Sequence, residues 1–115
     1  MEEKIRVFIA DANADFRKKF KNALSKDKFV VIGEADDGKV ALEKLKRCEP
    51  DILVVDLWLP SLDGTEIIRT QSGKALQKPT ISVVVSSINN QMMISEACAA
   101  GAMQCFLKPI DLSLP

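Results

Sequence analysis

The chain of 115 residues contains no histidine. General-base catalysis by an imidazole, metal ligation by histidine and an internal phosphohistidine are therefore excluded. No apolar run approaches the ~18–20 residues that a membrane span requires, and the acidic start MEEKIRVFIA is not typical of a signal peptide. We expect a protein without a membrane partner, whose chemistry depends on carboxylates, hydroxyls, lysines and backbone groups.

The chain also lacks an excess of either charge and has few cysteines. Sixteen basic residues balance sixteen acidic ones, which gives no electrostatic reason to expect direct contact with nucleic acid. Cys48, Cys98 and Cys105 are odd in number and have no CxxC spacing, so they are predicted to be reduced, mostly buried thiols of a cytoplasmic protein. The length favours one domain, residues 1–115, with a single core.

Five short apolar runs have the composition of β-strands. The middle three are rich in valine and isoleucine with little polar alternation, a pattern typical of strands buried on both faces. This pattern predicts a parallel sheet covered by helices. The five predicted strands are Lys4–Ala10, Phe29–Gly33, Asp51–Val55, Ile81–Val85 and Gln104–Leu107.

Helix-period segments alternate with these strands. The resulting order, βαβαβαβαβ, favours a doubly wound α/β fold with right-handed crossovers. Such folds bind ligands at the carboxyl ends of their strands, so the residues that follow each strand matter most. The predicted helices are Asp15–Leu24, Val40–Leu45, the segment TEIIRTQ after Gly64, and Gln91–Ala100.

Four chemically capable residues follow predicted strands. Asp11 follows the first strand, Asp56 the third, Ser86 the fourth and Lys108 the fifth. A carboxylate nucleophile needs a nearby cation to approach an anionic phosphoryl donor, which a lysine and a magnesium-binding acid would supply. A hydroxyl can then donate a hydrogen bond to a phosphoryl oxygen. The set favours phosphoryl transfer to a carboxylate.

The blocks IADAN (9–13), VVDLWLPSLDG (54–64), VVVSS (83–87) and FLKPI (106–110) resemble the signatures of two-component response-regulator receiver domains, the CheY-like superfamily. Their spacing is also similar to that of the family: 45 residues separate Asp11 from Asp56, 30 separate Asp56 from Ser86, and 22 separate Ser86 from Lys108. The resemblance covers essentially the whole chain. The segments KIRVFIADAN and VIGEADDG most resemble regulators with a DNA-binding output domain, among them the sporulation master regulators.

The resemblance implies a five-stranded parallel sheet of flavodoxin-like order 2-1-3-4-5 and a role for each residue. Asp56 would be the phosphoacceptor, phosphorylated by a histidine kinase or a phosphotransfer protein. Ser86 would hold the phosphoryl group and Lys108 would be the family's lysine. Asp11, Asp56 and the backbone carbonyl of Trp58 would bind Mg²⁺. Such a domain assists its own phosphorylation and dephosphorylation but is not a turnover enzyme, and it controls an output domain outside this chain, with transcription as the expected process.

The sequence departs from the family pattern in three places. Ala12 replaces a second acidic residue, which predicts weaker magnesium binding, and Asn13 could compensate through its carbonyl oxygen. Cys105 replaces an aromatic residue whose rotation follows the movement of the serine, which predicts another route of signal transmission. The final helix of the family is absent from this chain, which predicts an exposed apolar sheet face, covered by missing sequence or by another chain through exchange or dimerisation.

Two rival functions remain open. Ala12 and Cys105 would suit a pseudo-receiver that acts as an interaction module without phosphorylation. An aspartyl-nucleophile phosphatase has a similar sheet but requires a general acid two residues after the nucleophile, where this chain has Trp58.

Some of these residues also have simpler interpretations. Asp11 could cap the first helix, and Ser86 could cap the turn that follows it. The pair Asp36-Asp37 is predicted to form a turn. The basic run Arg17-Lys18-Lys19-Lys21 is predicted to be a solvated helix face or a docking surface for a partner.

Overall fold

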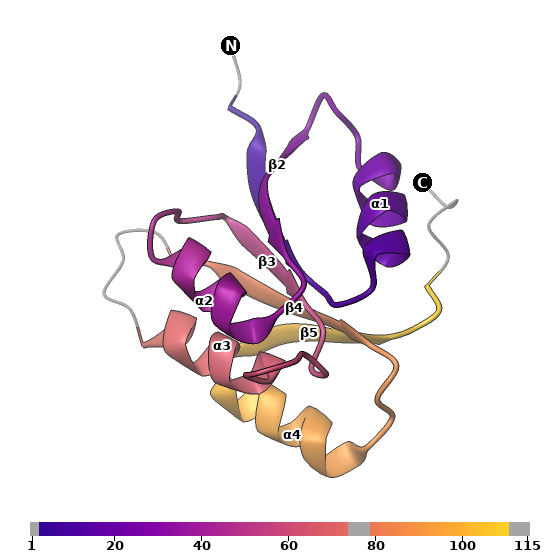
Figure 1. The fold of residues 1–115 in the computed structure, drawn as a ribbon, viewed down its shortest axis with the longest axis vertical. Coiled ribbons are helices and arrows are strands. Elements are labelled where there is room, and N and C mark those ends of the chain that lie inside the picture. The colour runs from indigo at the N-terminus through magenta and orange to yellow at the C-terminus, as the bar shows by residue number, and fades with distance from the viewer. Residues whose placement is uncertain (1–2, 74–78, 111–115) are drawn as a thin grey trace.

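The computed structural model describes residues 3–73 and 79–110. Five parallel strands form one sheet in the order β2-β1-β3-β4-β5, with helices on both faces (Figure 1). The doubly wound α/β fold and its flavodoxin-like order are therefore confirmed. The elements are β1 (Ile5–Ala10), α1 (Ala14–Ala23), β2 (Phe29–Ala35), α2 (Gly38–Leu45), β3 (Ile52–Val55), α3 (Gly64–Ser72), β4 (Ile81–Ser86), α4 (Gln91–Ala100) and β5 (Ala102–Leu107).

The burial of the strands follows their place in the sheet. β3 and β4 are central and largely buried, as the sequence predicts. For β2 the prediction of burial on both faces is wrong, because β2 is an edge strand and most of its residues are partly exposed. The first strand is central instead, and its last four residues are buried. Composition did not distinguish these two strands, because both are apolar and the order of the sheet decides which is covered.

The two faces of the sheet carry separate cores. Helices α2, α3 and α4 lie on one face and α1 lies on the other (Figure 1). The larger core lies under the three helices, and Phe8, Leu53 and Ile67 within it are completely buried. The smaller core consists of Val7, Ile9, Val54 and Val85, against which partly buried side chains of α1 pack.

The face that carries α1 is incompletely covered. Among the described residues, no helix follows β5 on this face. A groove of about 330 Å³ remains there, lined by Phe20, Val83, Val85, Phe106 and Ile110. The predicted exposure of an apolar sheet face is confirmed for the part of the chain that the structure describes, and residues 111–115 lie outside it.

Each helix begins at a side chain that accepts a hydrogen bond from the backbone of the first turn. Asn13, Asp37, Asp63 and Asn90 have extended backbones and act as N-caps of the four helices. The turn role predicted for Asp36-Asp37 is confirmed at Asp37, whose carboxylate accepts from two amides of α2. None of the described helices has the length and apolar character needed to cross a bilayer.

Candidate functional site

Asp56 is the first residue after β3 and lies at the carboxyl edge of the sheet. Its backbone amide donates to the carbonyl of Ala10 on β1, 3.0 Å away, which continues the pairing of these strands beyond β3. The loop that follows passes close to the backbone of Asp56, since a Cβ on Gly64 would lie 2.2 Å from the carbonyl oxygen of Asp56. Glycine at position 64 is therefore required by this close approach, and it fixes the backbone that carries the carboxylate.

Asp56 is only 6% exposed, and its carboxylate accepts hydrogen bonds on both oxygens. Its Oδ1 atom accepts from the Ser86 hydroxyl at 2.5 Å and from the Trp58 amide at 3.0 Å. Its Oδ2 atom accepts from Lys108 Nζ at 3.1 Å. The third, fourth and fifth strands thus bring three of the predicted site residues into direct contact.

A second buried carboxylate completes the cluster. Asp11 follows β1 and its Oδ2 atom lies 2.8 Å from Lys108 Nζ. Apart from this ion pair, Asp11 Oδ2 accepts no hydrogen bond. Asp11 Oδ1 accepts from the amide of Asn13, and Asn13 is the residue that caps α1. The interpretation of Asp11 as the helix cap is therefore wrong, and Asp11 belongs to the site.

Lys108 holds the two carboxylates together. Its backbone amide donates to the Ser86 carbonyl, and the Lys108–Pro109 peptide bond is cis. Its ammonium group lies between Asp11 and Asp56 and 4.4 Å above the ring of Phe16. Burial lowers the pKa of Lys108, but hydrogen bonds to Asp11 and Asp56 and their negative charges outweigh this effect, so its pKa is raised above the usual value. Lys108 is therefore protonated at neutral pH.

Ser86 has two hydrogen-bonding roles. Its hydroxyl donates to Asp56, and the same oxygen accepts from the amide of Ile88 at 3.3 Å. The interpretation as a turn cap and the interpretation as a site residue are therefore both consistent with the geometry. Ser86 is 2% exposed, so this contact with the Asp56 carboxylate is buried.

The residues fit a magnesium site with one acidic side chain fewer than the family pattern. Asp11 and Asp56 provide hard carboxylate oxygens, and Asp11 Oδ2 is buried with no hydrogen-bond partner beside its ion pair with Lys108. In the described part of the chain, no three acidic, cysteine or histidine side chains are close enough to form a metal site. Ala12 is exposed beside Asp11. The Asn13 side-chain carbonyl caps α1, so compensation by Asn13 would require it to give up this bond.

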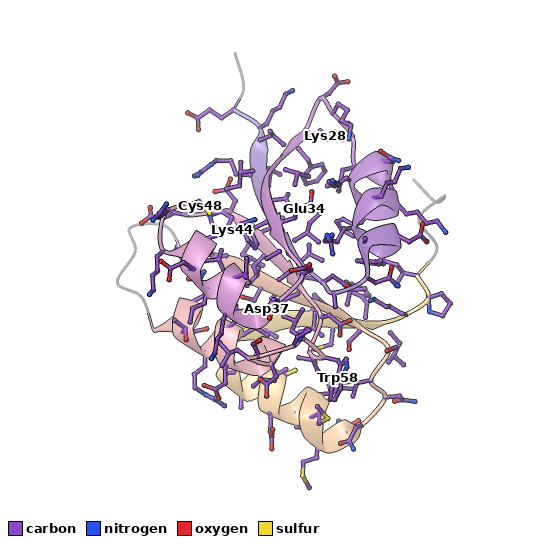
Figure 2. The ribbon with its side chains drawn as sticks, viewed as in Figure 1. Lys28, Glu34, Asp37, Lys44, Cys48 and Trp58 are labelled. Carbon is purple, nitrogen blue, oxygen red and sulfur yellow. The ribbon has the colours of Figure 1, made fainter. Side chains whose placement is uncertain are left out.

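Arg17 is a contributor to the site that sequence reasoning missed. Its guanidinium donates to the backbone carbonyl of Asp11 at 2.6 Å and to Glu34 at 2.8 Å. Lys21, one helical turn later, also pairs with Glu34, which lies on β2 toward α1 (Figure 2). The prediction of a freely solvated basic face is wrong for these two residues, which are only partly exposed and are paired with Glu34. Arg17 fixes the main chain that carries Asp11, and a glutamate on a distant strand gave no sequence signal of the pairing.

The surroundings of Ser86 contain one of the three predicted departures, Cys105. Cys105 lies on β5 and lines a small cavity of about 30 Å³ together with Ser86, Ile88 and Ile94. Trp58 follows the site in the loop after β3 and is 73% exposed (Figure 2). The indole therefore lies over the rim of the site and does not fill its interior.

Comparison with known proteins supports one family. A family model for the response regulator receiver domain matches residues 7–114. Chemotaxis protein CheY of Thermotoga maritima is 35% identical over 111 residues, which cover 94% of this chain and 88% of that protein. A protein-glutamate methylesterase of Myxococcus xanthus is 36% identical over 110 residues, but the match covers 95% of this chain and only 31% of that protein.

Solved structures agree with the sequence comparison. The signal receiver domain of NarL from Mycobacterium tuberculosis superimposes with a TM-score of 0.87 and 31% identity, covering 97% of this chain and 90% of that one. The response regulator domain of Thermotoga maritima CheB gives a TM-score of 0.83 and 32% identity, covering 96% of this chain and 82% of that one. The chain therefore belongs to the receiver-domain family of response regulators.

Proposed function

We propose that the chain is a phosphoacceptor receiver, phosphorylated on Asp56 by a histidine kinase or a phosphotransfer protein. The observation that carries the proposal is the carboxylate of Asp56, which is buried yet contacts a hydroxyl, an amide and an ammonium group at 2.5, 3.0 and 3.1 Å. A structural aspartate does not require this set of partners. A nucleophile that becomes an acyl phosphate does, because each partner can bond a phosphoryl oxygen.

The proposed step transfers a phosphoryl group between two nucleophiles. A carboxylate oxygen of Asp56 attacks phosphorus, the P–O bond forms, and the P–N bond of the donor phosphohistidine breaks. The departing imidazole takes a proton from solvent. Lys108 stays paired with the increased negative charge, and the Ser86 hydroxyl moves its hydrogen bond from the carboxylate to a phosphoryl oxygen.

Magnesium bound by Asp11, Asp56 and the Trp58 carbonyl would supply the positive charge that lets an anionic donor approach. Asp11 contributes the carboxylate, and Arg17 holds its backbone in place. Because Ala12 supplies no third carboxylate, we expect magnesium to bind more weakly here than in receivers with two acidic residues after the first strand.

The proposal is tested with a small phosphodonor, acetyl phosphate, and a magnesium series. The wild-type chain should give a slower band on a phosphate-retarding gel, and Asp56→Asn should abolish it. Asp36→Asn is the matched control, because Asp36 also follows a strand at this edge but is exposed. Loss of the band in both variants, or its survival in Asp56→Asn, would contradict the assignment.

A pseudo-receiver is the second candidate, and Ala12 and Cys105 favour it. It predicts a folded domain with no Asp56-dependent band at any magnesium concentration. In that case the output would depend on partner binding alone. A pull-down should then recover the same amount of partner with the wild-type chain as with Asp56→Asn.

The wider setting of the domain is also proposed. NarL of Mycobacterium tuberculosis, named as a probable transcriptional regulatory protein, is 34% identical over 107 residues that cover 92% of this chain and 49% of that protein. We propose a cytoplasmic regulator with an output domain beyond this chain, transcription as the regulated process, and no direct contact of this domain with nucleic acid. A further segment or a second copy would cover the groove at Phe20 and Val85.

A further inference from the structure

Two thiols lie in contact on the face of the sheet that carries α4. The Sγ atoms of Cys98 on α4 and Cys105 on β5 are 4.0 Å apart, and neither cysteine forms a disulfide. Neither residue belongs to the Asp56 cluster. Their proximity needs an explanation, since the sequence places them seven residues apart with no recognisable motif.

The backbone fixes both cysteines. Gly101, with a φ of 127°, reverses the chain from α4 into β5, and its amide donates to the carbonyls of Ala97 and Cys98. Cys105 is paired with Val84 in the β4–β5 ladder. A helix end and a sheet ladder therefore hold the two thiols facing each other, so their contact follows from the fold and not from a mobile loop.

The two thiols differ in their surroundings. Cys98 is exposed, whereas Cys105 is partly buried, so the prediction of mostly buried thiols is wrong. Burial raises the pKa of Cys105 to about 11, helped by the hydrogen bond to Cys98 and the charge on Cys98. Cys98 is therefore the sulfur that meets an oxidant, and Cys105 is the sulfur positioned to attack whatever forms on Cys98.

We propose that Cys98 and Cys105 are a thiol pair that a low-molecular-weight disulfide converts into an intramolecular disulfide bond tying α4 to β5. The Cys98 thiolate attacks the small disulfide, forms a mixed disulfide and releases one small thiol. Cys105 then loses its proton to solvent and attacks the Cys98 sulfur, releasing the second small thiol. The two protein thiols are oxidised and the small disulfide is reduced, so electrons and atoms balance.

The bond requires a modest local movement. A disulfide has an S–S length of about 2.03–2.05 Å, so the two sulfurs must approach by roughly 2 Å. Rotation of the two side chains, with a small shift of α4, supplies this movement. Cys105 also lines the cavity beside Ser86, so the bond would fix α4 to a wall of that cavity.

Cys48 is the matched control within the chain. It lies in the loop after α2, and its thiol donates to the carbonyl of Lys44 at 3.3 Å (Figure 2). It is partly exposed, and its hydrogen bond to a backbone carbonyl contrasts with the contact between the Cys98 and Cys105 thiols. The proposal therefore predicts that oxidation links Cys98 to Cys105 and leaves Cys48 outside the bond.

Cleavage after methionine gives a direct test, because Met103 lies between the two cysteines. The dilute protein is oxidised with glutathione disulfide, its free thiols are blocked, and it is cleaved with cyanogen bromide. Fragments 94–103 and 104–115 should stay joined until a reductant is added, while Cys48 stays in fragment 2–92. Cys98→Ser and Cys105→Ser should each abolish the link, and Cys48→Ser should keep it.

Hydrogen exchange then tests whether the disulfide restricts the motion of α4. In the cross-linked protein the amides of α4 should exchange roughly tenfold more slowly than in the reduced protein, with α2 unchanged. Separate fragments after oxidation, a link to the fragment that contains Cys48, or only glutathione adducts would overturn the proposal. Unchanged exchange in α4 of the linked protein would overturn the claim that the bond ties α4 to β5.

Discussion

Two charged clusters contact α1, and their composition is opposite. At the edge of the sheet, the carboxylates of Asp11 and Asp56 share the single ammonium of Lys108. On β2, the single carboxylate of Glu34 is shared by Arg17 and Lys21. The first cluster therefore has one net negative charge and the second one net positive charge.

This difference in net charge distinguishes a structural ion-pair cluster from a candidate functional site. At Glu34 the surplus charge is on long, partly exposed side chains of α1, where water can solvate it. At Asp56 the surplus is on carboxylates that are almost fully buried, where uncompensated charge is expensive. A buried negative surplus attracts a further cation, which supports the proposed magnesium site. The substitutions below test this distinction.

The largest effect is expected for Lys108→Met. The variant keeps the length of the side chain but leaves two buried carboxylates without their shared cation, which should lower the free energy of unfolding by about 3 kcal/mol at neutral pH. Urea denaturation monitored by circular dichroism measures this change.

Lys108→Arg is the control, since it keeps the positive charge and should recover most of the loss. Magnesium should also raise the unfolding midpoint of Lys108→Met more than that of the wild type, because binding to the folded state stabilises it. A loss of stability that neither the arginine nor magnesium reduces would mean that packing of the lysine stem, and not its charge, is what the cluster needs.

The sequence predicted the first cluster but not the second, and the reason is physical. Asp11, Asp56 and Lys108 follow strands, and parallel strands bring their carboxyl ends to one edge, so order along the chain was enough. Arg17 and Glu34 meet because α1 is rotated so that Arg17 and Lys21 face β2 while Lys18 and Lys19 stay exposed, and a rotation of this kind depends on packing. The same limit applied to the wrong prediction for β2, whose exposure depends on its edge position.

The second prediction concerns the missing acid. Ala12→Asp should restore a carboxylate next to Asp11, and a unit charge about 4 Å from a divalent ion contributes roughly 2 kcal/mol in water, or about 30-fold in affinity. Position 12 is exposed, so the change should be tolerated. Fluorescence of Trp58, the chain's single tryptophan, should report the magnesium titration because its amide contacts Asp56.

Ala12→Asn is the matched control, as it adds an oxygen of similar reach without charge and should give a much smaller gain. Equal magnesium affinity in the wild type and Ala12→Asp would show that the surplus of negative charge in the buried pair is already sufficient.

The smallest effect is expected at the second cluster. Glu34→Gln removes both ion pairs, but Arg17 and Lys21 are partly exposed and water can solvate them. The free energy of unfolding should therefore fall by only about 1 kcal/mol at neutral pH. Glu43→Gln, at an exposed pair with Lys46, should change stability by less.

The pH dependence of this variant gives the sharpest test of the comparison. The hydrogen bond from Lys21 holds the pKa of Glu34 below its usual 4.5, against the opposing effect of burial and with help from Arg17. A lowered pKa means that the stabilisation is present above pH 4.5 and is lost as the pH falls through the lower folded value. The difference between wild type and Glu34→Gln should therefore vanish in acid.

Lys108 should behave in the opposite way, because its folded pKa is raised above 10.5. Its stabilisation is fully present below that pH and is lost as the pH rises through the folded value. Unfolding midpoints measured from neutral to alkaline pH should then separate the two clusters: the Lys108→Met difference should close as Lys108 loses its proton, while the Glu34→Gln difference should remain because Glu34 stays ionised. A Lys108→Met difference that persists through the alkaline range would contradict the assignment of the Lys108 charge as the stabiliser of the two buried carboxylates.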